Sequence, residues 1–121
     1  MRSVLYGRPA VLGMALAVVL VLPNASALAQ EAPAVDMQAA SFNLTEVHIQ
    51  AGQSVVWNNA SGAEHTVTAD DGSFDSGDVE PANQYTMQFS AVGTYPYFCQ
   101  YHGGSGGVGM SGVIVVDSPT D

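Results

Sequence analysis

The chain has 121 residues, of which 47% are apolar, and its formal net charge is −9 at pH 7. This length and apolar content suit one domain with a modest core rather than two domains. Because an acidic surface repels phosphate groups, the charge argues against nucleic acids and anionic membrane surfaces as partners and favours a cationic partner. The acidic residues can equally serve only to keep an exported protein in solution.

The first 29 residues have the organisation of a cleavable export signal. Arg2 and Arg8 give a positive start, an apolar run follows from Ala10 to Leu22, and Ala27-Leu-Ala29 is a small-x-small cleavage pattern. The apolar run is shorter than the roughly 18 to 20 residues that a membrane-spanning helix needs. We therefore expect residues 1–29 to be removed and the mature chain, without a membrane span, to lie in the periplasm or outside the cell. Since these two arginines are the only basic residues besides histidine, the mature chain is more acidic still.

Residues 30–40 contain Ala, Pro and acidic residues without apolar periodicity, so we expect a flexible lead-in to a single domain spanning residues 41–121. Within that domain, short segments with alternating apolar residues are separated by turn residues, and no apolar pattern of helical spacing is found. The expected strands are 42–50, 54–59, 64–68, 83–90, 94–99 and 111–117. The acidic stretch 69–81 lacks the spacing of a calcium-binding loop and is expected to be a solvated loop. The pattern predicts an all-β protein, an antiparallel sandwich or barrel.

Three side chains with metal-binding atoms follow the strand that begins at Thr94. They are the Cys99 thiol, the His102 imidazole and the Met110 thioether, and Cys99 is the only cysteine, so it cannot form an intramolecular disulfide. The connection between them is rich in glycine, whose tolerance of positive φ lets a short segment double back and bring the three side chains together. Thiolate, thioether and imidazole donors favour copper, whereas zinc more often recruits a further thiolate or hard ligand.

A fourth donor must come from one of the two remaining histidines. His65 follows the turn Asn59-Ala-Ser-Gly62 and opens a strand, which is where the end of a sandwich can present a ligand. His48 lies between Val47 and Ile49, so period-two alternation turns it towards solvent. The predicted ligands of a single copper ion are therefore His65, Cys99, His102 and Met110.

Each of these residues has a simpler explanation when it is taken alone. Cys99 can be a small buried hydrophobic residue, Met110 can fill the core, and His102 can be an ordinary loop histidine. Their joint occurrence after a β-strand, with a spare histidine on an earlier strand, favours a metal site. Thr66 directly follows His65, and we expect its backbone amide to donate a hydrogen bond to the Cys99 sulfur.

The chain resembles the cupredoxins, in particular the small blue copper proteins of the plastocyanin and pseudoazurin type, over about residues 42–117. The matching segments are Val55-Val-Trp-Asn, Glu64-His-Thr-Val, Phe74-Asp-Ser-Gly, Gly93-Thr-Tyr-Pro-Tyr-Phe-Cys99, His102-Gly and Gly109-Met-Ser-Gly-Val-Ile-Val. The resemblance implies a Greek-key β-sandwich of roughly seven or eight strands. It also implies one type 1 copper held by the same four residues. Two departures are a longer glycine-rich segment between His102 and Met110, and Phe98 where plant plastocyanins carry a tyrosine.

By the same resemblance we expect an exported electron carrier that passes single electrons between redox proteins, with no enzymatic activity of its own. The chain has three histidines in all and no His-x-His pair of the kind that copper enzymes use for further metal sites. We expect a monomer whose redox partners present a cationic docking face. The alternative is a periplasmic copper carrier or storage protein without an electron-transfer role, which would release its metal to chelators within seconds.

Overall fold

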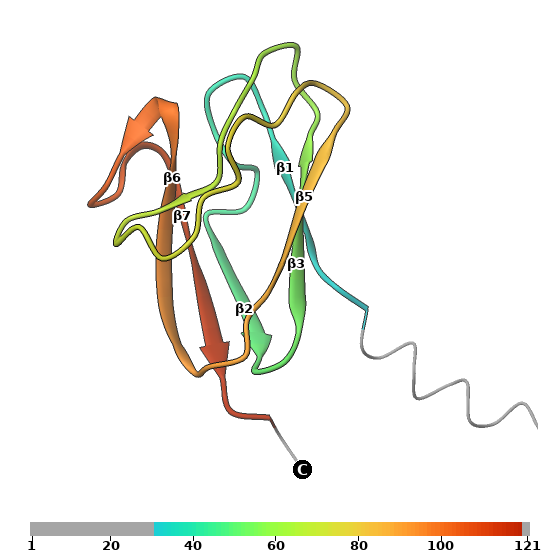
Figure 1. Ribbon diagram of the computed structural model, residues 1–121, viewed down its shortest axis with the longest axis vertical. Coiled ribbons are helices and arrows are strands. Elements are labelled where there is room, and N and C mark those ends of the chain that lie inside the picture. Colours follow the sequence, from blue (N-terminus) through green and yellow to red (C-terminus); the bar gives the residue numbers. More distant parts are fainter. Residues whose placement is uncertain (1–30, 120–121) are drawn as a thin grey trace, which may run out of the picture. The chain divides into compact units, whose positions relative to one another are not determined.

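The computed structural model describes residues 31–119, so the expected export signal at residues 1–29 lies outside the described residues. This part of the chain contains seven strands and no helix (Figure 1). The strands are β1 (Ala34–Met37), β2 (Glu46–Gln50), β3 (Ser54–Asn59), β4 (Thr68–Ala69), β5 (Gln84–Gln88), β6 (Gly93–Gly104) and β7 (Val108–Asp117). Among the residues described, none belongs to a helix long and apolar enough to cross a membrane.

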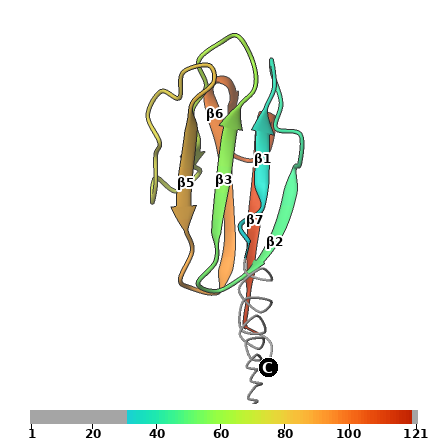
Figure 2. The ribbon, with the colours of Figure 1, turned by 90° about the vertical axis from the view of Figure 1, so that its right-hand side faces the viewer.

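The strands form two sheets, which confirms the predicted all-β sandwich. One sheet has the order β1-β3-β5 and the other β2-β7-β6-β4. Figure 2 shows β5, β3 and β1 side by side in one layer, with β6 and β7 behind them. The expectation of purely antiparallel sheets is wrong, because β1 pairs with β3 and β2 pairs with β7 in parallel. Parallel pairs arise here because the chain crosses between sheets, for example from β2 to β3, instead of returning beside the strand it has just left.

Strand β1 corrects the prediction of a flexible lead-in over residues 30–40. Val35 and Met37 are fully buried, and β1 pairs with β3 from Ala34 opposite Val56 to Met37 opposite Asn59. Burying a side chain of this size contributes about 1.5–3 kcal/mol. The compact part of the chain accordingly begins at Ala32 rather than at residue 41. A four-residue strand flanked by Ala and Pro is too short to reveal its alternation in the sequence.

Period-two alternation predicts that Val47 and Ile49 share one face of β2 and that Val55 and Trp57 share one face of β3, and both predictions are confirmed. Val55 and Trp57 are fully buried, Val47 and Ile49 are buried, and His48 is exposed. Strand β3 has the bounds that its sequence predicts. These strands therefore supply much of the apolar layer between the two sheets.

An aromatic cluster joins the two sheets beneath the end that carries Cys99. The rings of Trp57 from β3 and Tyr97 from β6 meet edge to face, with centroids 5.4 Å apart at an interplanar angle of 83°. Burial raises the pKa of Tyr97 to about 12, against a smaller opposing effect of the Trp57 indole. Tyr97 and Cys99 are two residues apart, so alternation puts them on the same side of β6, and both are buried. The cluster therefore forms a rigid base for the thiol two residues further on.

The segment between β3 and β5 contains less regular structure than the sequence predicts. Of the expected strand 64–68, only Thr68 belongs to a strand, β4, where it pairs with Phe98. Isolated bridges join His65 to Val79 and Thr68 to Asp75. The predicted loop 69–81 thus folds back along the chain that precedes it. Two hydrogen bonds between the backbones of His65 and Val79, at 3.2 and 2.7 Å, hold His65 in place.

The glycine-rich connection between His102 and Met110 is a β-hairpin rather than an irregular loop. Strand β6 continues to Gly104 and β7 starts at Val108, with Gly103 opposite Gly109. Figure 1 shows this hairpin in orange, with its tip bent away from the remainder of β6 and β7. The pairing of β6 with β7 shifts its register between Phe98 and Gly103, which is the stretch that contains Cys99 and His102.

Candidate metal centre

Three of the four predicted ligands come together at one end of the sandwich. The Cys99 Sγ atom lies 3.6 Å from His65 Nδ1 and 3.6 Å from His102 Nδ1, and the two imidazole centroids are 4.9 Å apart. The three donor atoms all lie within 4.8 Å of one another. Within residues 31–119, no other group of three His, Cys, Asp or Glu side chains converges in this way.

The register shift in β6 brings His102 to the same side as Cys99. In a regular strand, residues three apart point to opposite faces of the sheet. Between Phe98 and Gly103 the strand departs from regular pairing with β7, and such an irregularity re-aims side chains. The Cys99 thiol is fully buried, whereas His102 is exposed, so the group of donors reaches from the core to the surface.

Hydrogen bonding determines which nitrogen of His65 faces the thiol. His65 Nε2 lies 2.9 Å from the Ser61 Oγ atom, and Ser61 Oγ donates at 2.8 Å to Asn59 Oδ1. Since a hydroxyl has one hydrogen, Ser61 accepts from the Nε2–H of His65, which leaves the lone pair of Nδ1 directed at Cys99. Asn59 is itself buried, and its amide donates to the Ala63 and Val79 carbonyls at 2.7 and 2.8 Å.

The sequence predicts only a turn at Asn59-Ala-Ser-Gly62, and the contacts of Asn59 and Ser61 with each other and with His65 become visible only in the structure. A Ser four residues before a ligand histidine is a weak signal, because serine is common in turns whatever its partners are. The polar turn residues therefore act as the outer support of a ligand, which is a frequent arrangement around metal-binding histidines.

The pKa of His65 is lowered from its ordinary value. Burial is the main cause and the nearby His102 adds to it, while a contact with the Gln38 backbone acts in the opposite direction. A lowered pKa keeps the imidazole neutral at neutral pH, which is the form that binds a metal.

The predicted hydrogen bond to the cysteine sulfur is present. The Thr66 backbone N–H donates to Cys99 Sγ at 3.4 Å, in a fully enclosed environment. An N–H group aimed at sulfur compensates the negative charge that a thiolate brings into the interior. Thr66, the residue after His65, therefore contacts the Cys99 sulfur, so the backbone links these two predicted ligands.

Met110 lies on β7 beside this group. Its side chain is buried, and its backbone runs against Gly103, where an added Cβ would lie 2.5 Å from the Met110 carbonyl oxygen. The close passage of the two hairpin arms thus places residue 110 next to the residue that follows His102. A ligand role for Met110 stays a prediction.

The donors present suit copper. One thiol and two imidazoles that present Nδ1, with a buried thioether on the neighbouring strand, form a set with the softness that copper selects. A zinc site more often takes a fourth thiolate, imidazole or carboxylate, and none joins the group among residues 31–119.

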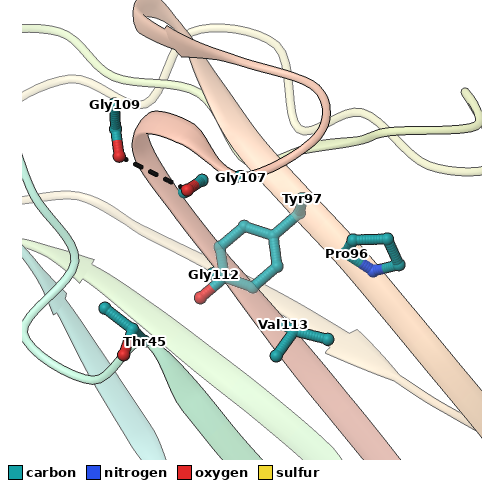
Figure 3. Close-up of a pocket in the computed structure, with 8 residues that line it drawn as sticks. Thr45, Pro96, Tyr97, Gly107, Gly109, Gly112 and Val113 are labelled. Carbon is teal, nitrogen blue, oxygen red and sulfur yellow. Dashed lines mark hydrogen bonds between the residues drawn. The ribbon is translucent and has the colours of Figure 1, made fainter.

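A pocket of about 430 Å³ lies away from these donors (Figure 3). It is lined by Thr45, Pro96, Tyr97, Gly107, Gly109, Ser111, Gly112 and Val113. The Ser111 hydroxyl donates to the Gly109 carbonyl at 3.3 Å. None of the four predicted ligands lines the pocket, and no acid–base pair does either. The predicted metal ligands therefore lie outside this pocket.

Comparisons with known proteins agree with this geometry. The family model of a cupredoxin-like domain matches residues 11–116. A plastocyanin from Scenedesmus fuscus is 35% identical over 92 residues, which cover 67% of this chain and 91% of that protein. Amicyanin-alpha from Methylorubrum extorquens is 37% identical over 97 residues, which cover 73% of this chain and 77% of that protein.

Solved structures show the same likeness. An oxidised amicyanin variant has a TM-score of 0.63 at 25% identity, over 71% of this chain and 82% of that chain. A reduced Cu(I) form of another amicyanin variant has the same TM-score and identity. With the family model matching most of its length, the chain belongs to the family of cupredoxin-like domains.

Proposed function

We propose that the chain is a type 1 blue copper protein that passes single electrons between redox proteins. The observation that carries this proposal is the buried Cys99 thiol, which faces the Nδ1 atoms of two histidines at 3.6 Å each. Together with Met110 they would hold one copper ion, which when bound supplies a reversible one-electron change between Cu(II) and Cu(I). The plastocyanin and amicyanin relatives support this assignment.

Separate contacts hold each of the three converging side chains, His65, Cys99 and His102, in place. Ser61 orients the His65 ring, the Thr66 amide contacts Cys99, and β6 carries both Cys99 and His102. Donors that are already held by sheet and hydrogen bonds move little when the charge of the centre changes. A small rearrangement favours fast electron transfer, because less solvent and protein must reorganise.

His102 is the proposed point of electron entry and exit. It is the exposed member of the group, whereas His65 and Cys99 are fully enclosed. Tyr101 precedes His102, and Val108 lies opposite Gly104 in the same hairpin. These two side chains are 54% and 60% exposed, which supports an apolar surface on this hairpin for brief contact with a partner.

Acidic side chains near His102 support a cationic docking face on the partner. Glu64 and Glu80 lie close enough that Glu80 raises the pKa of the Glu64 carboxyl, with Asp78 adding to the effect. Carboxyl groups gathered in this way concentrate negative charge, which attracts a cationic surface at low salt. We infer that the protein acts as a monomer in transient complexes of this kind.

The mature protein is proposed to work outside the cytoplasm, in the periplasm or the extracellular space, and not as an enzyme. The export signal pattern supports the location outside the cytoplasm. The lack of histidines for a second copper site supports a carrier rather than an enzyme. A copper carrier or storage protein needs an open site that releases its metal. Full burial of Cys99 and His65 argues for a site that retains it.

The test is to load the mature chain with one equivalent of Cu(II) and record its absorption and electron paramagnetic resonance spectra. We expect an intense thiolate-to-copper absorption band and a narrow copper hyperfine splitting. Voltammetry should show reversible oxidation and reduction, and a chelator should not remove the copper. Cys99→Ser should abolish the band. His48→Ala is the matched control, because His48 is exposed on β2 and should leave the spectra unchanged. An unaltered spectrum in Cys99→Ser would refute the ligand assignment.

A further inference from the structure

The loop that follows β4 contains five acidic residues between positions 70 and 80. They are Asp70, Asp71, Asp75, Asp78 and Glu80. The sequence alone assigns them to solvent. In the structure, however, three of the five carboxylates accept hydrogen bonds from residues of the segment that carries Cys99 and His102.

Asp70 holds the tip of the β6–β7 hairpin. Its Oδ2 atom accepts a hydrogen bond of 2.9 Å from the Gly106 backbone N–H, 36 residues later in the chain. The backbone of Asp70 also donates to the Pro96 carbonyl of β6 at 2.9 Å. Asp70 is thus attached to one end of β6 and reaches the far end of the hairpin. The tip lies beyond the last hairpin pair, Gly104 opposite Val108.

Asp78 binds the residue next to His102. The Tyr101 hydroxyl donates to Asp78 Oδ1 at 2.5 Å. Tyr101 lies in the stretch of β6 where the pairing with β7 is interrupted, so the sheet constrains it less than a regular strand residue. A bond from its side chain to the acidic loop restricts the backbone that leads into His102.

Asp75 acts on Cys99 through two buried threonines. Asp75 Oδ1 accepts from the Thr68 hydroxyl at 3.1 Å, and Thr68 Oγ1 is 2.9 Å from Thr66 Oγ1. A carboxylate only accepts, so the single hydroxyl hydrogen of Thr68 points to Asp75 and Thr66 must donate to Thr68. The lone pairs of Thr66 Oγ1 are then free to accept the Gln100 N–H, which lies at 2.9 Å.

This series of hydrogen bonds ends at Cys99 Sγ and at the backbone amide of the residue that follows Cys99. Thr66 donates its own N–H to Cys99 Sγ and accepts from the amide of the next residue, Gln100. The Gln100 side chain closes the network by donating to Thr68 at 3.2 Å and to Asp75 at 3.3 Å. The direction of every hydroxyl in it is determined by the carboxylate of Asp75.

The other two acidic residues lack such contacts. Asp71 accepts from the Ser73 backbone within its own loop at 2.9 Å, and Glu80 interacts with Glu64. Asp71 is adjacent to Asp70, is exposed, and carries the same charge. It therefore separates the effect of removing a charge from the effect of removing a contact.

We infer that Asp70, Asp75 and Asp78 are positioning residues, which hold the Cys99–Gly106 segment from outside the sheet and thereby determine how Cys99 and His102 face the metal. The segment needs such support because its pairing with β7 is interrupted and its hairpin is rich in glycine, which gains the most freedom when it is released. The part of this inference that concerns the metal rests on the proposed function, whereas the hydrogen bonds can be tested without metal.

The first experiment measures amide hydrogen exchange by NMR in the metal-free mature chain, for Asp70→Ala, Asp75→Ala and the control Asp71→Ala. We expect exchange at the Gly106 amide to become about five- to tenfold faster in Asp70→Ala, as the loss of one hydrogen bond implies. The same increase is expected at the Gln100 amide in Asp75→Ala. Asp71→Ala should leave the exchange rates of both amides unchanged. Unchanged exchange at the Trp57 amide shows that the domain stays folded, so that the change is local.

The second experiment compares copper-loaded variants, with Asp78→Ala added. We expect each of the three Ala variants to change the copper hyperfine splitting and the reduction potential beyond the change in Asp71→Ala. Asp70→Asn and Asp75→Asn keep an acceptor oxygen and should restore the hyperfine splitting. If Asp70→Ala and Asp75→Ala match Asp71→Ala in exchange, and all three Ala variants match it in spectra, the inference is wrong. If the unaltered chain shows no thiolate band, the proposed function fails instead, whatever the exchange data show.

Discussion

His65 presents its Nδ1 atom to Cys99 because its other ring nitrogen is bonded to the Ser61 hydroxyl at 2.9 Å. Without that hydroxyl the ring loses the contact that selects its orientation and its tautomer. Ser61 is in turn held by Asn59, a buried residue that accepts from the Ser61 hydroxyl and backbone N–H and donates to the Ala63 carbonyl. The orientation of one ligand therefore depends on a turn that precedes it by four residues.

We predict that Ser61→Ala lowers the affinity for copper by about tenfold, the usual cost of losing the partner of a ligand histidine. A competition titration with a chelator of known affinity measures this change. Ser73→Ala is a suitable control, because Ser73 is exposed and its hydroxyl contacts Asp71 within the acidic loop. Equal affinities in the two variants would contradict the role of Ser61.

The residues of the centre differ in how far their roles could be predicted. Cys99 and His102 follow from chemistry and spacing, since a single cysteine after a strand with a nearby histidine has few other uses. His65 follows by exclusion of His48, whose neighbours Val47 and Ile49 reveal its face. Roles such as that of Ser61 or Asp75 depend on hydrogen bonds between segments whose approach is known only once the chain is folded.

At the level of elements, the β6–β7 hairpin depends on two glycines where its arms pass closely. A Cβ added at Gly103 would lie 2.5 Å from the Met110 carbonyl oxygen and 2.6 Å from that of Val108. At Gly109, which has a φ of +64°, it would lie 2.5 Å from the His102 carbonyl oxygen. The neighbouring Gly104 has room, with its nearest contact at 3.9 Å.

Gly103→Ala and Gly104→Ala therefore form a matched pair. We predict that Gly103→Ala lowers the free energy of unfolding by about 1–3 kcal/mol, because backbone must move to accept the methyl group. It should also broaden the thiolate band, since the shift occurs between His102 and Met110. Gly104→Ala should change stability by less than about 1 kcal/mol. Denaturant unfolding and absorption spectra of both variants check this, and similar behaviour of the two would exclude the steric explanation.

Strand β1 offers a second test at this level. Val35→Ala removes two methyl groups from a fully buried position, and we predict a loss of about 2 kcal/mol in the free energy of unfolding. The control is Val92→Ala, the same substitution at a side chain that is 59% exposed, which should stay within about 0.5 kcal/mol. Thermal unfolding of both variants measures the difference. Equal stability would show that β1 contributes little to the core.

The sequence predicts faces of strands better than their partners. In Val55-Val-Trp57 the alternation is unambiguous, and β3 lies where it is predicted. The parallel pairing of β2 with β7 cannot be read in this way, because alternation says which residues point inward and not which strand lies alongside. Strand β1 is missed for a related reason, since Val35 and Met37 are only two inward positions in four residues.

At the level of the whole molecule, acidic residues far outnumber basic ones. Arg2 and Arg8 are the only Lys or Arg residues, so every positive charge within residues 31–119 must come from a histidine. The ion pairs found there are those of His48 with Glu46 and Asp117. The surface near His102 therefore repels anions and attracts cationic proteins.

We predict that electron transfer to a small basic haem protein slows by about tenfold when ionic strength rises from about 10 to 200 mM, because salt screens the attraction. Stopped-flow mixing of reduced copper protein with the oxidised partner measures this rate. A small uncharged oxidant provides the control and should react at the same rate throughout. A rate independent of salt with the basic partner would mean that the acidic residues serve solubility alone.

The buried position of Cys99 also bears on what the proposed export to an oxidising compartment would do to its thiol. Its thiol is the only one in the chain and has no contact with solvent in the folded state. An exposed thiol in such a compartment forms mixed disulfides or links two chains together. Here those reactions are open only to the unfolded chain, so completing the fold protects the one sulfur atom that must stay reduced to receive the metal.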